Sequence, residues 1–183
     1  MTKARTLASF DPSGVLTSAS TLNPANLDAA GTIPSALLDD VGGGKVLQAV
    51  SATYSTEASS TDASNWTDTG LTLSITPSSA DSKVLFIISQ QANVSRASSL
   101  GRGIFRVMRD STVVFDSANH TIALQQTGSD MAHSTMLSFS GLDSPSTTSA
   151  ITFKTQMLPD SGTTIKAQQN NHPSTITLLE IAA

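Results

Sequence analysis

The stretch Lys83-Val84-Leu85-Phe86-Ile87-Ile88-Ser89 is the strongest fold signal in the chain. It is a short, unbroken apolar run that contains several β-branched residues, and Ser78-Ser79 and Asp81-Ser82 precede it. A run of this length next to turn-forming residues is typical of a β-strand. Because its apolar residues do not alternate with polar ones, we predict a central strand that is buried on both faces.

Runs of the same kind occur on both sides of this stretch, with clusters of Ser, Asp, Gly and Pro between them. We predict strands over residues 46–54, 66–75, 103–109, 112–115, 121–126, 132–140, 150–158, 163–168 and 174–181. The segments between the runs show no convincing helical periodicity. The sequence therefore predicts an all-β protein, with an antiparallel β-sandwich or jelly roll. Within 103–109 we expect Arg106 and Arg109 to share a face, and we expect the arginines to pair with Asp110 and Asp116.

Small hydroxyl side chains dominate the composition. The chain has 29 Ser and 24 Thr among 183 residues, whereas only 13% of residues are charged and 4% are aromatic. Threonine packs well on a pleated sheet, and serine forms turns. Uncharged hydroxyl faces also let subunits pack without the cost of desolvating charge. We therefore predict a homo-oligomer, and we favour a homotrimer by analogy with other domains that carry an N-terminal arm.

Residues 1–43 differ from the rest of the chain because Pro and Gly interrupt them every few residues, up to Gly42-Gly43-Gly44. We interpret 1–43 as an extended N-terminal attachment arm with a glycine hinge and a short helical turn over 35–40, and 44–183 as a β-sandwich knob domain. A functionless leader is the alternative. The arm residues predicted to contact a partner are Leu7, Phe10, Leu16, Leu22, Leu27, Ile33, Leu37 and Leu38.

The composition argues against several classes of function. A chain without cysteine has no disulfide framework, zinc ribbon, iron–sulfur site or thiol nucleophile. Ten Lys and Arg against fourteen Asp and Glu, with no basic cluster, argue against a nucleic-acid partner. No apolar run approaches the roughly 18 residues of a membrane span, so we expect no membrane insertion. The residues after Arg5 lack the apolar core of a secretory signal.

Motifs of known catalytic sites are missing as well. Gly42-Gly43-Gly44-Lys45 lacks the other residues of a phosphate-binding loop, and no Gly-x-Ser-x-Gly elbow occurs. A pair of catalytic carboxylates is harder to exclude, but Glu57 and Glu180 are the only glutamates. We therefore predict a protein that is not an enzyme and has no catalytic or cofactor-binding residues.

Metal and ligand sites have weak signals. His120, His133 and His172 lie far apart without ligand spacing, so we predict no metal site, although a symmetry axis could gather copies of one histidine. Tyr54 and Trp66 are the aromatic residues that would contact a ligand or a partner subunit if they lie on the surface. The alternative is that both fill the core or an interface.

Several segments resemble structural proteins of tailed phages, in particular tail-fibre-like proteins. The resemblance lies in Gly44-Lys45-Val46-Leu47-Gln48 and in Leu73-Ser74-Ile75-Thr76-Pro77-Ser78-Ser79-Ala80-Asp81-Ser82-Lys83-Val84-Leu85. It continues in Leu142-Asp143-Ser144-Pro145-Ser146-Thr147-Thr148-Ser149 and Ser174-Thr175-Ile176-Thr177-Leu178-Leu179-Glu180-Ile181. Met1-Thr2-Lys3-Ala4-Arg5 and the stretch from Asn26 to Pro34 resemble the N-terminal regions of such fibres.

The resemblance implies a virion protein on the surface of a phage particle, made in the host cytoplasm. It implies a trimer with an arm for attachment to other virion proteins of the capsid or tail, and it implies no catalytic residue. Long fibres carry extended shafts, and this chain has none. A short fibre, a head fibre or a capsid decoration (cement) protein therefore fits best. The alternative is a receptor- or carbohydrate-binding adhesion module that contacts the host cell surface.

Overall fold

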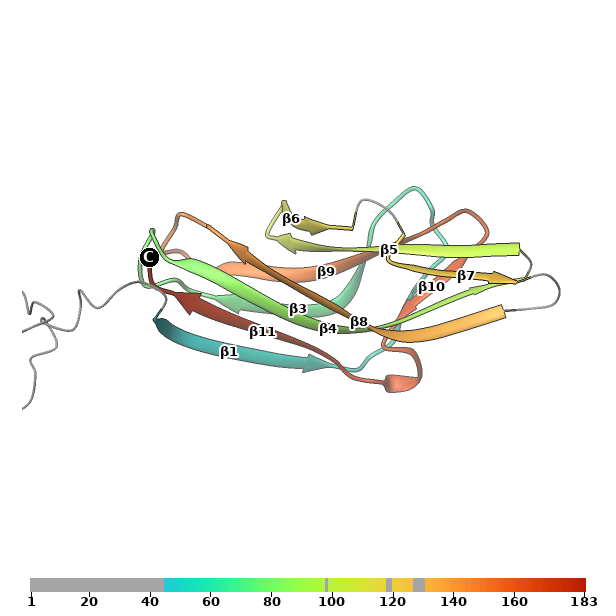
Figure 1. Ribbon diagram of the computed structural model, residues 1–183, viewed down its shortest axis with the longest axis horizontal. Helices are drawn as coiled ribbons and strands as arrows, with labels where there is room; N and C mark the ends of the chain where they lie inside the picture. Colours follow the sequence, from blue (N-terminus) through green and yellow to red (C-terminus); the bar gives the residue numbers. More distant parts are fainter. Residues whose placement is uncertain (1–44, 98, 118–119, 127–130) are drawn as a thin grey trace, which may run out of the picture. The chain divides into compact units, whose positions relative to one another are not determined.

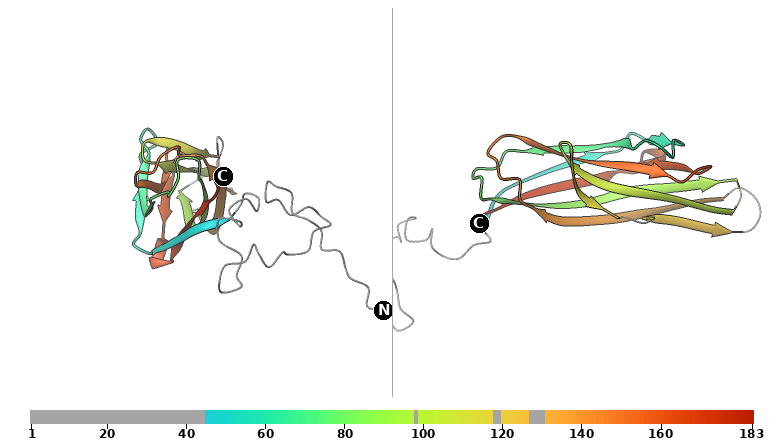
Figure 2. Two further views of the ribbon diagram at one scale, coloured as in Figure 1. Left: turned by 90° about the vertical axis from the view of Figure 1, so that its left-hand side faces the viewer. Right: turned by 90° about the horizontal axis from the view of Figure 1, so that it is seen from above.

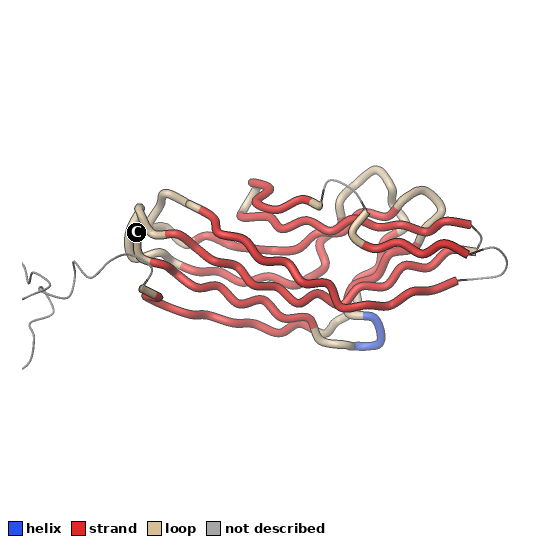
Figure 3. The backbone as a smooth tube through the Cα atoms, viewed as in Figure 1, coloured by secondary structure: helices blue, strands red, loops and turns tan. Residues whose placement is uncertain are grey.

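The computed structural model describes residues 45–97, 99–117, 120–126 and 131–183. These residues form strands and connecting loops, with one short 3₁₀ turn, η3 (Gln169–Asn171) (Figure 3). The strands are β1 (Val46–Tyr54), β2 (Ala58–Ser60), β3 (Thr67–Ile75), β4 (Lys83–Arg96), β5 (Ser99–Arg109), β6 (Thr112–Asp116), β7 (Ile122–Gln126), β8 (Met131–Asp143), β9 (Ile151–Pro159), β10 (Thr164–Ala167) and β11 (Ser174–Ile181). The predicted all-β fold is confirmed. The interpretation of residues 1–43 as an arm lies outside the described residues.

The strands form two antiparallel sheets stacked face to face (Figures 1 and 2). Sheet A has the order β1-β11-β4-β8, and β10 and β2 extend it beside the second half of β4. Sheet B has the order β3-β9-β5-β6, and β7 pairs with the first half of β5. The pairs β1–β11, β3–β9, β4–β8 and β5–β6 are nested in the sequence, as in one long hairpin rolled into two sheets. This is the strand order of a jelly roll.

The core lies between the two sheets, where each strand contributes every second residue. Phe86 from β4 and Phe153 from β9 meet across the layers, with ring centroids 5.9 Å apart. Val84, Phe86 and Ile88 are buried in this core. The expectation that both faces of this strand are buried is wrong, because Leu85 is only partly buried and Ile87 is exposed on the other face.

A buried polar cluster holds the sheets together at the point where β4 changes partner. On one edge β4 pairs with β11 up to Ser89 and with β10 from Ala92 onward. Between them the hydroxyl of Ser174 accepts from the backbone N–H of Gln91, at 2.9 Å. The Thr155 hydroxyl of β9 donates to Oε1 of Gln90 on β4, at 2.8 Å. These hydrogen bonds replace the missing ladder, and they link sheet A to sheet B.

A second buried polar group closes one end of the sandwich. Glu180 of β11 is buried, and its carboxylate accepts from the backbone N–H and the hydroxyl of Ser78, both at 2.7 Å. The Gln48 amide of β1 donates to the same carboxylate at 2.6 Å and to the Thr76 carbonyl at 2.7 Å. Burial by itself would raise the pKa of Glu180, but these hydrogen bonds outweigh it and lower the pKa to about 2. The carboxylate thus ties the β3–β4 loop to β1 and β11.

Candidate interaction surface

The outer face of sheet A presents one regular array of side chains over β1, β11, β4 and β8. The ladder aligns Ser51 of β1 with Thr177 of β11, which in turn lies opposite Ile87 of β4, and Ile87 lies opposite Ser140 of β8. The rows on either side follow the same two-residue period. We call this array the uncharged face, and its residues are Ala49, Ser51, Thr53, Leu85, Ile87, Ser89, Met136, Ser138, Ser140, Leu142, Thr175, Thr177 and Leu179.

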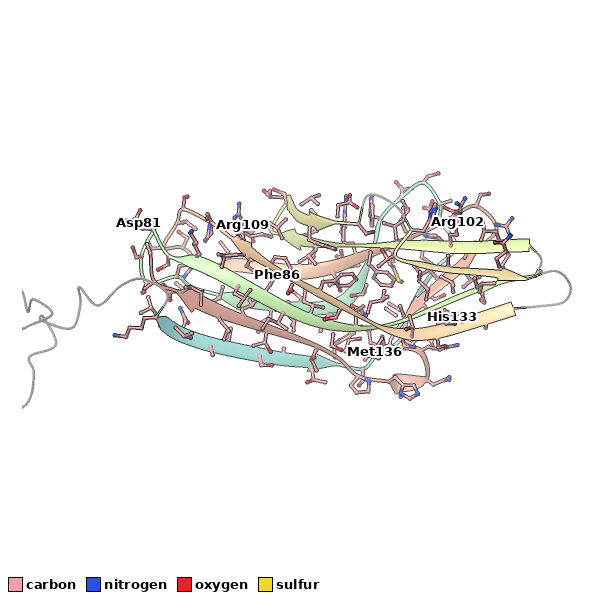
Figure 4. All side chains as sticks on the ribbon, in the orientation of Figure 1. Asp81, Phe86, Arg102, Arg109, His133 and Met136 are labelled. Carbon is pink, nitrogen blue, oxygen red and sulfur yellow. The ribbon has the colours of Figure 1, made fainter. Side chains whose placement is uncertain are left out.

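Large apolar side chains on the uncharged face are open to solvent. Leu142 is 56% exposed, Met136 is 53% exposed and Ile87 is 44% exposed. Figure 4 labels Met136 on the outer side of β8, away from the core residue Phe86. The surrounding hydroxyls form hydrogen bonds with one another, as between Oγ of Ser51 and Oγ1 of Thr177, which lie 3.1 Å apart. Lys83 and Lys166, which pairs with Glu57, belong to sheet A but lie outside this array. Exposed aliphatic residues grouped without a charged side chain among them are typical of a contact surface.

The outer face of sheet B has the opposite character. Asp68 of β3 accepts from the Lys154 ammonium at 2.9 Å and from the Gln156 amide at 2.6 Å, both on β9. Arg106 of β5 donates to the Oε1 of Gln156 at 2.8 Å and stacks on the ring of Trp66 at 4.0 Å from its centroid. Side chains of three strands are therefore joined within this chain, and their charges face water.

The electrostatics of this network follow from its contacts. Burial by itself would raise the pKa of Asp68, but the hydrogen bonds from Gln156 and Lys154 outweigh it, so the pKa lies below its ordinary value. Burial lowers the pKa of the Arg106 guanidinium, although the charges of Asp116 and Asp68 oppose that effect. Arginine stays protonated at neutral pH. The network is a set of charge-assisted contacts at neutral pH, which is typical of a solvated surface.

The two predicted aromatic residues occupy different places. Tyr54, at the end of β1, packs against the core, and its ring lies over Gly70, where a Cβ would clash with Cε1 of the ring. The φ of 86° at Gly70 also favours glycine. Trp66 lies on the outer side of sheet B under the guanidinium of Arg106. The eight apolar residues predicted as arm contacts lie outside the described residues. Neither aromatic belongs to the uncharged face.

The prediction that the arginines pair with Asp110 and Asp116 was partly wrong. The charge of Asp116 does act on Arg106, but the other two arginines have different partners. Arg102 pairs with Asp160 at 2.7 Å, and Arg109 pairs with Asp143 of sheet A. Figure 4 shows Arg102 and Arg109 well apart along the molecule. Arg106 and Arg109 do not share a face, because residues three apart in a strand point to opposite sides.

Both glutamates and one histidine have structural partners. Glu57 pairs with Lys166 at 2.8 Å, and Glu180 is held by Ser78 and Gln48, so each has its own local partners. Asp160 lies 3.3 Å from His120. Among the described residues no group of three or more His, Asp or Glu could hold a metal ion. In the same part of the chain no helix is long and apolar enough to cross a membrane.

Sequence reasoning did not find the uncharged face, although its signal is present in the chain. Met136, Ser138, Ser140 and Leu142 carry the even numbers of one strand, and a two-residue period places them together. What the sequence lacks is a sign of which side of the strand faces the core. Phe139 settles that side only once the sheets are known to be stacked.

Comparisons with known proteins give no family. No protein-family model matches the chain, and no characterised protein matches its sequence. Among solved structures, that of infectious bursal disease virus Gt strain is 16% identical with a TM-score of 0.29, and it covers 76% of this chain and 39% of that chain. The VP2 subviral particle of infectious bursal disease virus is 12% identical with a TM-score of 0.32, covering 76% and 38%. The chain thus spans about two fifths of the chains it matches, and the jelly roll is assigned from the strand order alone.

Proposed function

We propose that the protein is a non-enzymatic structural subunit of a virus particle, in which the uncharged face packs against a neighbouring subunit and the outer face of sheet B faces water. The single observation that carries this proposal is the contrast between these two faces. Exposed leucine, isoleucine and methionine on a face without paired charges gain free energy when a partner covers them. The Ser and Thr hydroxyls of that face add no charge that the contact would have to desolvate.

The finer assignment extends this proposal with the resemblance to phage proteins. The particle is a bacteriophage, the subunit is a homotrimer, and residues 1–43 anchor it to a capsid or tail protein. The protein is then a short fibre or a capsid decoration protein. The alternative function is a receptor- or carbohydrate-binding adhesion module, in which case the purified protein would bind host cells in a saturable manner.

The experiment that tests the proposal measures mass in solution. Multi-angle light scattering of the full chain should give a homo-oligomer, and Ile87→Lys should weaken the association about 100-fold, because an unpaired buried charge costs about 3 kcal/mol. The matched control is Ser74→Lys on the outer face of sheet B, which should leave the mass unchanged. Both variants should keep the circular dichroism of the parent. A monomeric parent, or equal effects of the two lysines, would contradict the proposal.

Removal of residues 1–43 separates assembly from attachment. The truncated protein should keep the number of subunits of the full-length oligomer, since the uncharged face lies within residues 49–179. It should no longer bind particles in a co-sedimentation assay. Binding equal to that of the full chain would exclude the arm as the anchor.

A further inference from the structure

The edges of the two sheets differ as much as their faces do. On sheet B, β6 and β7 have five residues each, and the β5–β6 ladder shifts register between Val107 and Met108. The β3 edge carries Asp68 and a register shift between Asp68 and Thr72. Short strands, bulges and edge charges are the features by which proteins prevent an edge from pairing with another chain.

In the residues described, the edge of sheet A at β8 is neither short nor bulged, and it carries a charge only at its end. β8 runs for thirteen residues, and among the described strands it pairs with β4 alone. Its register with β4 is unbroken over all thirteen positions, and the strand contains no Pro, Lys or Arg. Its one carboxylate, Asp143, stands at the end and is paired with Arg109. An edge of this kind presents a row of backbone N–H and C=O groups that can accept another strand.

We infer that β8 pairs antiparallel with β8 of a second copy of this chain, about a two-fold axis at Leu137. Length is the first argument, since the opposite edge of sheet A, β1, has only nine residues, and another β8 can match all thirteen. Symmetry is the second, because a strand paired with itself closes at two copies, whereas β8 on β1 of the next copy need not close.

Side-chain placement is the third argument. Pairing about Leu137 places Met136 opposite Ser138 and Ser134 opposite Ser140, all on the outer side of β8. The uncharged face then continues from one copy into the other. The same register places His133 opposite Gly141 and Asp143 opposite Met131, so like charges do not meet across the ladder. A shift by one residue would turn the two faces to opposite sides.

This contact is separate from the packing proposed above. The proposed function covers the uncharged face, whereas β8 offers its backbone edge, so one copy can make both contacts. If the face forms a three-fold contact, the edge joins two such trimers. The inference therefore goes beyond the proposed function and does not require it.

Single cysteines test the inference cleanly, because the chain has none of its own. Full-length S134C, M136C, S138C and S140C are oxidised singly and in equimolar mixtures in which one variant carries an affinity tag. Non-reducing electrophoresis then separates mixed dimers from dimers of identical chains by size. M136C with S138C, and S134C with S140C, should each give at least about fivefold more mixed dimer than M136C with S140C. The matched control is V113C on β6, also an exposed edge residue, which should stay at the background level.

Each other outcome overturns the inference. Equal yields for all mixtures, or yields no higher than that of V113C, would show that β8 does not pair with itself. A dimer between S138C and S51C of β1, without the β8–β8 dimers, would assign the edge to a head-to-tail contact instead. The series is repeated with Ile87→Lys: the same pairs should still cross-link when the face contact is lost. Loss of the pattern in Ile87→Lys would show that the cross-links depend on the face contact, which would overturn the edge contact and leave the proposed function standing.

Discussion

The two outer faces of this sandwich come from strands of similar length in one chain, yet one carries paired charges and the other carries exposed apolar side chains. On sheet B, Asp68, Lys154, Gln156 and Arg106 satisfy one another, so the face is complete without a partner. On sheet A, Ile87, Met136 and Leu142 lie in solvent, and hydroxyls separate them. A chain of 13% charged residues has few charges to place: those of Asp68, Lys154 and Arg106 lie on the outer face of sheet B, whereas on sheet A Lys83 and the Lys166–Glu57 pair lie outside the uncharged face. The difference teaches that charge, more than hydrophobicity, distinguishes a solvated sheet face from a contact face.

The hidden carboxylate of sheet A provides the largest expected effect on stability. Glu180 lies on the inner side of β11, so sheet A keeps this charge away from its uncharged face. Glu180→Gln removes the charge that Ser78 and Gln48 bind, and it places an amide N–H₂ where donors converge. We expect a loss of about 3 kcal/mol in the free energy of unfolding, measured by urea denaturation at pH 7. Glu57→Gln, at the exposed pair with Lys166, is the control and should change it far less, because solvent screens that pair.

The lowered pKa of the same carboxylate predicts that the protein loses stability in acid. The pKa of Glu180 is about 2 in the folded protein, below its ordinary value of 4.5. A lowered pKa stabilises the fold above pH 4.5, and this stabilisation is lost as the pH falls from 4.5 toward 2. Urea midpoints between pH 7 and pH 2 should therefore fall more steeply for the parent than for Glu180→Gln. Parallel curves of urea midpoint against pH would show that Glu180 does not cause the loss of stability in acid.

The inner side of β8 gives the next effect. A Cβ on Gly141 would lie 2.5 Å from Cζ of Phe86, a ring that the core holds in place. Gly141→Ala should therefore cost about 2 kcal/mol by overpacking. Its neighbour on the uncharged face, Ser140, offers the control, because Ser140→Ala should change stability by less than about 0.5 kcal/mol. Thermal unfolding of both variants tests whether the two sides of one strand differ as the burial predicts.

Local signals explain why most strands could be predicted. Residues 174–181 are a strand with the predicted bounds, because alternation and the preceding proline are features of adjacent residues. The short β2 was missed, since three residues such as Ala58–Ser60 carry no period. Burial of Gln90 could not be predicted either, because its partners Ser174 and Thr155 lie far away in the sequence. The unbroken run 83–89 misled for a different reason: one sequence cannot show whether its own chain or another covers the second face.

A smaller effect is expected at Trp66. Its ring carries the Arg106 guanidinium at 4.0 Å, so Trp66→Ala should cost about 1 kcal/mol in stability and leave the mass in solution unchanged. Met136→Ala on the uncharged face should have little effect on the stability of the monomer but should weaken the association between subunits. Urea denaturation measures the stability of both variants, and light scattering measures their association. A change of mass in Trp66→Ala would place that aromatic in the interface.

The smallest effect on stability is expected at the exposed ion pair on the outer face of sheet B. The side chains of Lys154 and Asp68 are 32% and 54% exposed, so solvent screens their attraction. Asp68→Asn keeps the shape, removes the charge and should cost about 0.5 kcal/mol at low salt and less at high salt. The pKa of Asp68 is lowered, so its contribution is present at neutral pH and is lost in acid. Association should not change with salt or with Asp68→Asn, because the uncharged face offers no charge to screen. Salt-dependent association would show instead that charged residues of sheet B take part in the contact.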